Sequence, residues 1–258
     1  MLLAYADNGP GPVVVLLHGF PFDRGMWEAQ QIALGSTYRL ITPDLRGHGE
    51  SAAPTGIYTM DDMADDVVEL LDALRITEPV VLGGLSMGGY VALALAVRHP
   101  KRLRGLMLLD TKATADTPEA ARGREELAQK VEALGSAEPV VKAMVPKLFS
   151  QATRLNRPEL IARLEERMLR TPARGVAGAL RGMAVRPDRT GELSRISVPT
   201  LVIVGSEDVI TPPTEARAMA QALPNAELVE IPDAGHLAPL ENPAPANAAM
   251  LAFLEALA

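Results

Sequence analysis

Short apolar runs alternate with helical patterns along this chain. The clearest runs occupy residues 13–17, 38–42, 80–82, 103–109, 201–204 and 228–231. They are rich in Val, Ile and Leu, which suits strands of a parallel sheet that is covered on both faces. Strands that alternate with helices predict an α/β fold with a doubly wound, mostly parallel sheet.

Helix signals fall between these runs. Thr59 fits a helix N-cap, and Asp61 and Asp62 suit the positive end of the helix that follows. Further helices are expected after Pro212 and over residues 245–257.

Residues 114–185 break the alternation, because they show four helical patterns and no convincing strand. The start signals are Thr117-Pro118, Ser136, Pro158 and Thr171-Pro172. We interpret this segment as a helical cap inserted before the last two strands. The core domain would then comprise residues 1–113 and 186–258.

Charge and composition exclude several classes of protein. The net charge of −7 argues against a nucleic-acid or anionic-membrane partner. The absence of cysteine excludes disulfides and thiolate chemistry. Residues 79–97 carry no charge, but four glycines in their first half favour a strand, a turn and a helix over a membrane span. Residues 1–6 lack the features of a secretory signal, so we expect a cytoplasmic protein.

The charge is unevenly spread along the chain. Residues 111–195 contain 16 Lys/Arg and 11 Asp/Glu, whereas the rest contains 9 and 21. Solvated helix faces are the ordinary explanation. The alternative is a basic cap that docks on an acidic body.

A nucleophile motif follows the run at 80–82, where Gly84-Leu85-Ser86-Met87-Gly88 fits G-x-S-x-G. A sharp strand-to-helix turn is the context that this motif requires, because it projects the serine Oγ above the sheet. Small residues two positions away on each side let the strand and the helix approach closely. Ser86 is therefore the candidate nucleophile, with a glycine-rich structural turn as the alternative.

A serine hydroxyl needs a base that takes its proton, and the chain offers four histidines. His99 ends a helix, His48 lies in a tight turn, and His18 ends the first long strand. His236 follows the last strand, and the chain order of serine, acid and histidine favours it as the base.

Two aspartates compete for the role of orienting acid, and both follow predicted strands. Asp208 lies in a glycine-initiated loop that ends at Thr211-Pro212, which fixes the path of the loop. Asp110 leads straight into Lys112, which could pair with it. We favour Asp208 as the acid and expect Asp110 to be a structural carboxylate.

Two backbone N–H groups are candidates to stabilise a developing oxyanion. The N–H of Met87 begins the helix after the nucleophile. The N–H of Phe20 belongs to the His18-Gly19-Phe20 loop after the first long strand. His18 is then expected to hold this loop rather than to catalyse.

The chain resembles the α/β-hydrolase superfamily, in the branch of small bacterial esterases, enol-lactonases and cofactor-free perhydrolases. The matching residues span nearly the whole chain, in the order of the family: 18–20, 44–51, 84–89, 205–208 and 235–236. Only about one strand precedes Val13, so we expect the outermost of the usual eight strands to be missing.

The resemblance implies a Ser86–His236–Asp208 triad that forms an acyl-enzyme without a cofactor or metal. Carboxylic-ester hydrolysis is our first choice, and lactone hydrolysis, including that of enol-lactones, is the alternative. Dehalogenases and epoxide hydrolases of this layout are disfavoured, because they use an aspartate nucleophile and this chain has Ser86 at that position. Carbon–carbon bond hydrolysis is less favoured, because those hydrolases often have Trp after the catalytic histidine, where this chain has Leu237. Perhydrolysis would be a side reaction of the same site. A non-catalytic receptor is least favoured, because the chain keeps all three triad residues.

Aromatic residues make up only 3% of the chain, so we expect a pocket lined mainly by aliphatic and Met side chains. The aromatic candidates are Phe20, Phe22, Trp27 and Phe149. No cluster of His, Asp and Glu has convincing metal-ligand spacing. The expected partner is a small-molecule ester or lactone, and a homodimer is left open.

Overall fold

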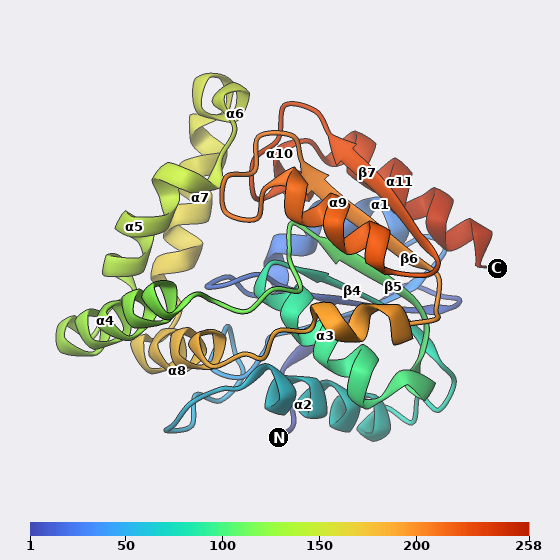
Figure 1. The fold of residues 1–258 in the computed structure, drawn as a ribbon, viewed down its shortest axis with the longest axis horizontal. Helices are drawn as coiled ribbons and strands as arrows, with labels where there is room; N and C mark the ends of the chain where they lie inside the picture. The colour runs from blue at the N-terminus through green and yellow to red at the C-terminus, as the bar shows by residue number, and fades with distance from the viewer. Residues whose placement is uncertain (258) are drawn as a thin grey trace.

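The computed structural model describes residues 1–257, and a seven-stranded sheet forms the centre of that part (Figure 1). The strand order is β1-β3-β2-β4-β5-β6-β7; β1 is antiparallel to β3, and the other neighbours are parallel. The strands are β1 (Tyr5–Asn8), β2 (Val13–Leu17), β3 (Arg39–Pro43), β4 (Val80–Leu85), β5 (Leu103–Leu109), β6 (Thr200–Gly205) and β7 (Ala226–Ile231). The predicted doubly wound, mostly parallel α/β sheet is confirmed.

Helices cover both faces of this sheet. Helices α1 and α11 pack together on one face, α2 and α3 pack together on the other, and α9 packs on β6 and β7 (Figure 1). Thr59 caps α2, as predicted, and its Oγ1 accepts the N–H of Asp62 at 3.1 Å. The core helices are α1 (Glu28–Leu34), α2 (Met60–Ala73), α3 (Met87–Arg98), α9 (Pro213–Ala222), α10 (Ala238–Glu241) and α11 (Pro243–Ala256). Short 3₁₀ turns are η1 (Arg24–Trp27), η2 (Pro100–Arg102) and η3 (Thr190–Arg195).

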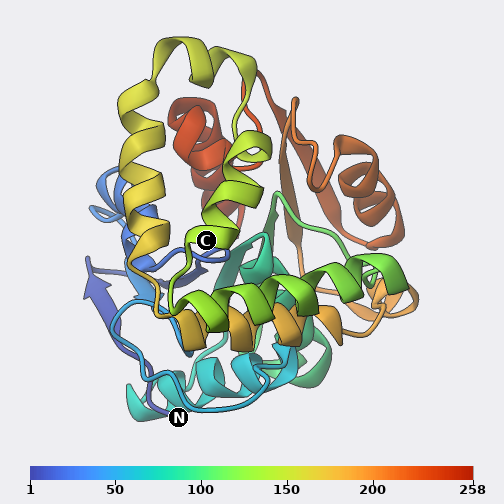
Figure 2. The same cartoon turned by 90° about the vertical axis from the view of Figure 1, so that its left-hand side faces the viewer.

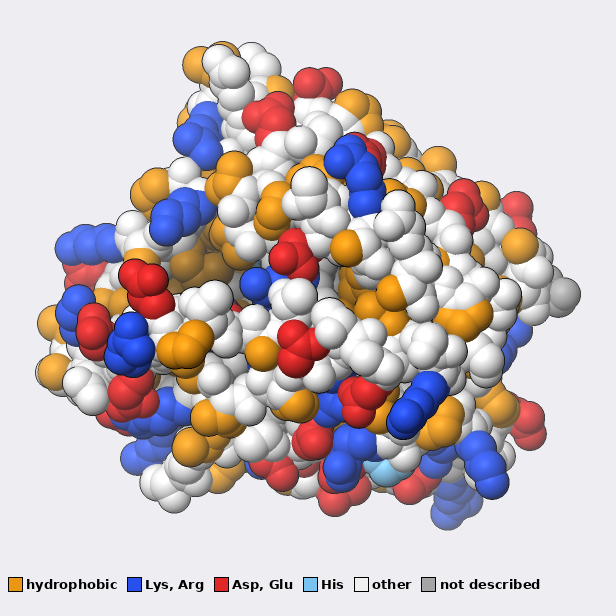
Figure 3. All heavy atoms as spheres, in the orientation of Figure 1, with side chains coloured by type: hydrophobic (Ala, Val, Ile, Leu, Met, Phe, Trp, Pro, Cys, Tyr) orange, Lys and Arg blue, Asp and Glu red, His pale blue; other side chains and the backbone are white. Residues whose placement is uncertain are grey.

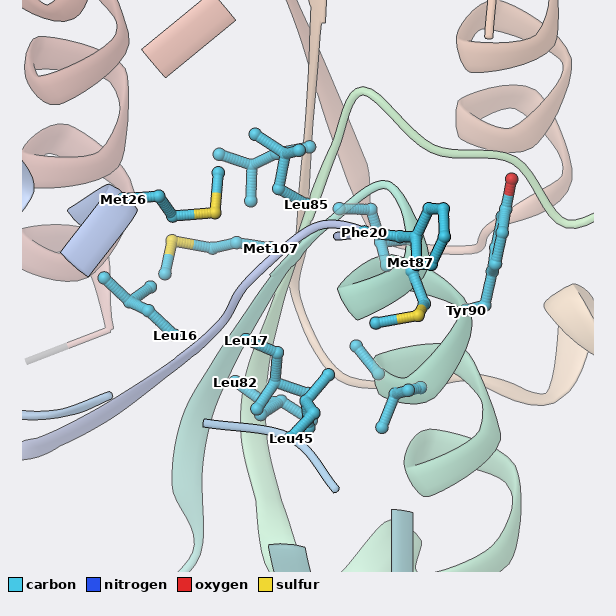
Figure 4. Packing of buried hydrophobic residues seen from close by; sticks show 14 of the residues in the cluster. Leu16, Leu17, Phe20, Met26, Leu45, Leu82, Leu85, Met87, Tyr90 and Met107 are labelled. Atoms are coloured by element: carbon cyan, nitrogen blue, oxygen red, sulfur yellow. The ribbon is translucent and has the colours of Figure 1, made fainter. Parts of the chain in front are cut away.

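The central strands are buried on both faces, which explains their continuous apolar sequences. Every residue of β4 and β6 is buried. Leu16, Leu82 and Met107, from three neighbouring strands, belong to this core (Figure 4). The carboxyl ends of the parallel strands meet at one edge of the sheet, which is where open α/β sheets bind ligands.

Five helices lie between β5 and β6, and we refer to residues 114–185 as the cap. They are α4 (Pro118–Leu134), α5 (Glu138–Leu148), α6 (Gln151–Asn156), α7 (Pro158–Leu169) and α8 (Ala173–Ala184). They stand to one side of the sheet in Figure 1 and in front of it in Figure 2. The short α6 was not predicted; its N-cap is Ser150, whose Oγ accepts the N–H of Thr153 at 3.1 Å.

Residues 79–97 form β4, the turn at Ser86 and most of α3 rather than one continuous helix. Among residues 1–257, no helix combines the length and apolar character that a membrane span needs.

Candidate active site

Ser86 lies in the turn between β4 and α3, with φ 53° and ψ −113°. This left-handed conformation is strained for a residue with a side chain, and such strain often marks a functional position. The flanking glycines explain how the turn closes. A Cβ on Gly84 would lie 2.1 Å from the carbonyl oxygen of Gly88, and one on Gly88 would lie 2.3 Å from that of Leu17. Strand and helix therefore approach too closely for any larger residue.

The last residue of β5 and a residue just after that strand hold this turn in place. The N–H of Ser86 donates to the carbonyl oxygen of Leu109 at 2.9 Å. The hydroxyl of Thr111 donates to the carbonyl oxygen of Ser86 at 2.8 Å. Thr111 could not be recognised from the sequence, because nothing in its local sequence shows that the preceding strand, β5, lies beside β4.

The structure brings together Ser86, His236 and Asp208. His236 Nε2 lies 2.8 Å from Ser86 Oγ, and His236 Nδ1 lies 2.8 Å from Asp208 Oδ2. Asp208 follows β6 and His236 follows β7, so the parallel sheet delivers both to the edge where β4 ends. Both are almost fully buried.

The Asp208 carboxylate is fixed by four hydrogen bonds. Its Oδ1 accepts the N–H groups of Ile210 (2.8 Å) and Thr211 (3.0 Å), and its Oδ2 accepts the Thr211 hydroxyl at 2.7 Å besides His236. Burial opposes ionisation, but the charge and hydrogen bond of His236 and the Thr211 hydrogen bonds outweigh it, so the pKa of Asp208 is lowered. Asp208 is therefore an ionised acceptor of fixed orientation. From the sequence, Thr211 was expected only to mark the end of this loop.

Glu241 holds the loop that carries His236. Its Oε1 accepts the N–H groups on both sides of the histidine, from Gly235 at 2.9 Å and Leu237 at 3.2 Å. Its Oε2 accepts the N–H of the cap residue Ser150 at 2.8 Å. This buried glutamate could not be recognised from the sequence, where it is an ordinary acidic residue near a helix start.

Asp110 is fully buried at the same edge of the sheet, but its carboxylate binds backbone N–H groups rather than the imidazole of His236. Its Oδ1 accepts the N–H of Gly205 at 2.8 Å, and its Oδ2 accepts the N–H of Ala238 at 3.0 Å. Burial and the nearby negative charge of Asp208 raise the pKa of Asp110 well above its ordinary value, against the effect of these two hydrogen bonds. Within residues 1–257 it forms no ion pair with Lys112, so the partner suggested by the sequence is wrong.

The N–H groups of Phe20 and Met87 donate to no acceptor within residues 1–257. The loop that carries Phe20 lies against the nucleophile, since a Cβ on Gly19 would be 3.6 Å from Ser86 Cβ. His18 holds this loop, because its Nε2 accepts the N–H of Leu45 at 2.9 Å. Both candidate donors are thus free to bind a substrate oxygen.

Ser86 and His236 open onto a cavity of about 360 Å³ between the core and the cap. Figure 3 shows the hollow on this side of the molecule, with hydrophobic side chains on its walls. The other lining residues are Phe20, Tyr90, Ala120, Gly123, Arg124, Leu127, Ala143, Met144, Lys147, Leu180, Met183, Val209 and Ile210. The predicted aliphatic and Met character therefore fits, but the two basic residues and Tyr90 were not foreseen.

Three predicted pocket residues lie elsewhere, which corrects the sequence analysis. Phe22 and Trp27 are 0% exposed in the hydrophobic core. Phe149 is 2% exposed and borders a separate hollow beside Glu207. Large aromatic rings gain most from complete burial, so proximity in sequence to the site did not place them on the cavity wall.

Among residues 1–257, no three His, Asp or Glu side chains are grouped so that they could hold a metal ion.

This chain belongs to the α/β-hydrolase family, since the family model described as "alpha/beta hydrolase fold" matches residues 12–243. It is 35% identical over 243 residues to 3-oxoadipate enol-lactonase 1 of Acinetobacter baylyi, with 93% of this chain and 88% of that protein covered. The structure of a thermophilic esterase from Thermogutta terrifontis with malate bound matches with a TM-score of 0.97 at 47% identity, covering 99% and 93% of the two chains. The enol-lactonase from Burkholderia xenovorans matches with a TM-score of 0.91 at 32% identity, covering 98% and 96%.

Proposed function

We propose that this α/β hydrolase cleaves carboxylic esters of small to medium size through an acyl-enzyme intermediate. The observation that carries the proposal is the hydrogen-bonded chain from Ser86 Oγ through His236 to Asp208, which faces a cavity large enough for a small molecule. The free N–H groups of Phe20 and Met87 are the donors that a tetrahedral oxyanion needs. The similarity to a thermophilic esterase supports the same reaction.

The geometry supports a two-step mechanism. Ser86 Oγ attacks the ester carbonyl while His236 Nε2 takes its proton, and Asp208 stabilises the imidazolium. The N–H groups of Phe20 and Met87 hold the negative oxygen, and His236 then returns the proton to the leaving alcohol. A water molecule, activated by His236, releases the acid from Ser86.

Lactone hydrolysis is the second candidate, favoured by the similarity to two enol-lactonases. The same residues would perform it, because a lactone is a cyclic ester whose leaving oxygen stays tethered to the acyl group. A panel of open-chain esters and lactones, compared by kcat/KM, decides between the two.

An organophosphate is expected to label Ser86 once per chain and to abolish turnover of 4-nitrophenyl acetate, because Ser86 is the only serine of residues 1–257 whose hydroxyl lies within hydrogen-bond distance of a histidine. Peptide mass spectrometry locates the label, and Ser86→Ala should remain unlabelled. Ser206→Ala, at the exposed start of the Asp208 loop, is the matched control and should label normally.

Dialysis against EDTA should leave turnover unchanged, since the mechanism needs no Lewis acid. Labelling at another residue or loss of activity in EDTA would refute the proposal.

A further inference from the structure

Two basic side chains of the cap line the cavity that contains Ser86, Arg124 from α4 and Lys147 from α5. No aspartate or glutamate lines this cavity within the described part of the chain, and most of the other lining residues are apolar. Apolar walls weaken the screening of a charge, so an anionic group that enters would be drawn to this side of the cavity.

One nitrogen of the Arg124 guanidinium, Nη1, has no strong hydrogen-bond acceptor among residues 1–257. Its Nε and Nη2 face the carboxylate of Asp116, but the only acceptor near Nη1 within residues 1–257 is Met183 Sδ at 3.5 Å. Thioether sulfur is a weak acceptor. Asp116 also pairs with Arg186 at 2.8 Å, so its carboxylate is shared between two guanidinium groups.

The ammonium of Lys147 forms no ion pair with another residue in the 1–257 range, and its side chain is exposed. Lys142, one turn earlier on the same helix, pairs with Glu138 at 2.5 Å. A lysine in the last turn also suits the helix dipole, but that role does not require it to line the cavity.

Tyr90 adds a third polar group. Its ring lies beneath Arg186, with the guanidinium carbon 4.2 Å from the ring centre. Its hydroxyl has no hydrogen-bond partner among residues 1–257 and is directed away from Leu17, Leu45 and Leu82 (Figure 4). Tyr90 lines the same cavity as Arg124 and Lys147, so its hydroxyl is a further donor for a ligand there.

We infer that the preferred substrates carry a carboxylate on the acyl chain, which Lys147 and Arg124 bind while Ser86 attacks the ester carbonyl. The inference rests on the proposed ester hydrolysis and names its substrate class. A carboxylate suits this site because the planar fork of arginine matches its two oxygens, and because lysine adds a point charge.

Two esters of equal chain length test the inference, mono(4-nitrophenyl) adipate and 4-nitrophenyl hexanoate. We expect the adipate ester to have the higher kcat/KM, by roughly tenfold or more, since charge-assisted hydrogen bonds are worth about one to two orders of magnitude. Lys147→Gln should lower kcat/KM for the adipate ester about fivefold, as expected for an exposed charge pair. The loss should lie in KM, because the contact is made equally in the ground state and the transition state. Turnover of the hexanoate ester should change less than about twofold, because it makes no such contact.

Lys142→Gln is the matched control, because it removes the same charge from the same helix outside the cavity lining. It should leave both esters within about twofold of the wild type. Arg124→Met should act in the same direction as Lys147→Gln, and raising the ionic strength should reduce only the preference for the adipate ester.

Equal losses for both esters in Lys147→Gln, or no preference for the adipate ester in the wild type, would overturn the inference. A preference for 4-carboxyphenyl hexanoate over phenyl hexanoate, without one for the adipate ester, would place the anion on the alcohol side and would also overturn it. In each of these cases the wild type still labels at Ser86 and still turns over the hexanoate ester, whereas failure of the proposed function abolishes both.

Discussion

Asp208→Asn is expected to hydrolyse 4-nitrophenyl acetate with a kcat about 10⁴-fold below the wild type, by analogy with the serine-protease triad. Asp208 Oδ2 accepts hydrogen bonds from His236 Nδ1 and from the Thr211 hydroxyl. Its Oδ1 accepts two backbone N–H groups, so the amide oxygen of Asn would take that position and its NH₂ would face the imidazole. The proton would then move to Nε2, which could no longer accept the proton of Ser86 Oγ.

Asp110→Asn is the matched control, because Asp110 follows the neighbouring strand and is equally buried, but bonds Gly205 and Ala238 rather than the imidazole. It should retain far more activity than Asp208→Asn. Steady-state kinetics gives kcat, and circular dichroism establishes that both variants fold. If Asp110→Asn were the more damaging of two folded variants, Asp110 and not Asp208 would orient the histidine.

The positions of the triad residues could be predicted because each lies just after a strand. Ser86 and His236 are 150 residues apart in the chain, yet their side chains meet at 2.8 Å. A parallel sheet collects the carboxyl ends of its strands at one edge, so the order of strands and turn motifs was enough to place them. Asp208 was separable from Asp110 because its loop, not its strand, directs the carboxylate.

The walls of the cavity could not be predicted in the same way. Helical periodicity shows which side of a cap helix is apolar, but not which element that side faces. Arg124 and Lys147 therefore look like ordinary surface residues in sequence, and Phe22 and Trp27 look like pocket residues although they are core. Glu241 was missed for a related reason, since its three N–H partners belong to two separate segments.

Acidification is expected to destabilise this protein strongly below about pH 6.5, because two adjacent histidines are buried as neutral rings. The ring centres of His18 and His48 are 5.0 Å apart, and both residues are 0% exposed. Burial lowers the pKa of His18 to about 4. Burial, and then the charge of His18, lower the pKa of His48 to about 3. His18 also needs its Nε2 lone pair for the N–H of Leu45, and His48 Nε2 has no hydrogen-bond partner in the described structure.

The direction of this pH effect on stability depends on whether the folded or the unfolded chain binds more protons at a given pH. Between pH 6.5 and about 4 the unfolded chain protonates both histidines while the folded chain protonates neither, so the free energy of unfolding falls as the pH falls. Each histidine accounts for on the order of 3 kcal/mol over this window, at about 1.4 kcal/mol per pKa unit. The raised pKa of Asp110 acts in the opposite direction, because the folded chain then holds a proton that the unfolded chain has lost.

Urea unfolding at pH 7 and pH 4.5 measures this loss, and His48→Asn tests its origin. Asn keeps a donor for the carbonyl oxygen of Arg46, which lies 3.0 Å from His48 Nδ1, but it does not titrate. The variant should be less stable than the wild type at pH 7, because the ring leaves a cavity. Its further loss on going to pH 4.5 should be smaller than that of the wild type by about 2 kcal/mol. His99→Asn removes a partly exposed histidine and leaves both buried rings in place, so it should keep the larger acid-induced loss. If His48→Asn and the wild type lost the same stability, protonation of the buried pair could not be the cause.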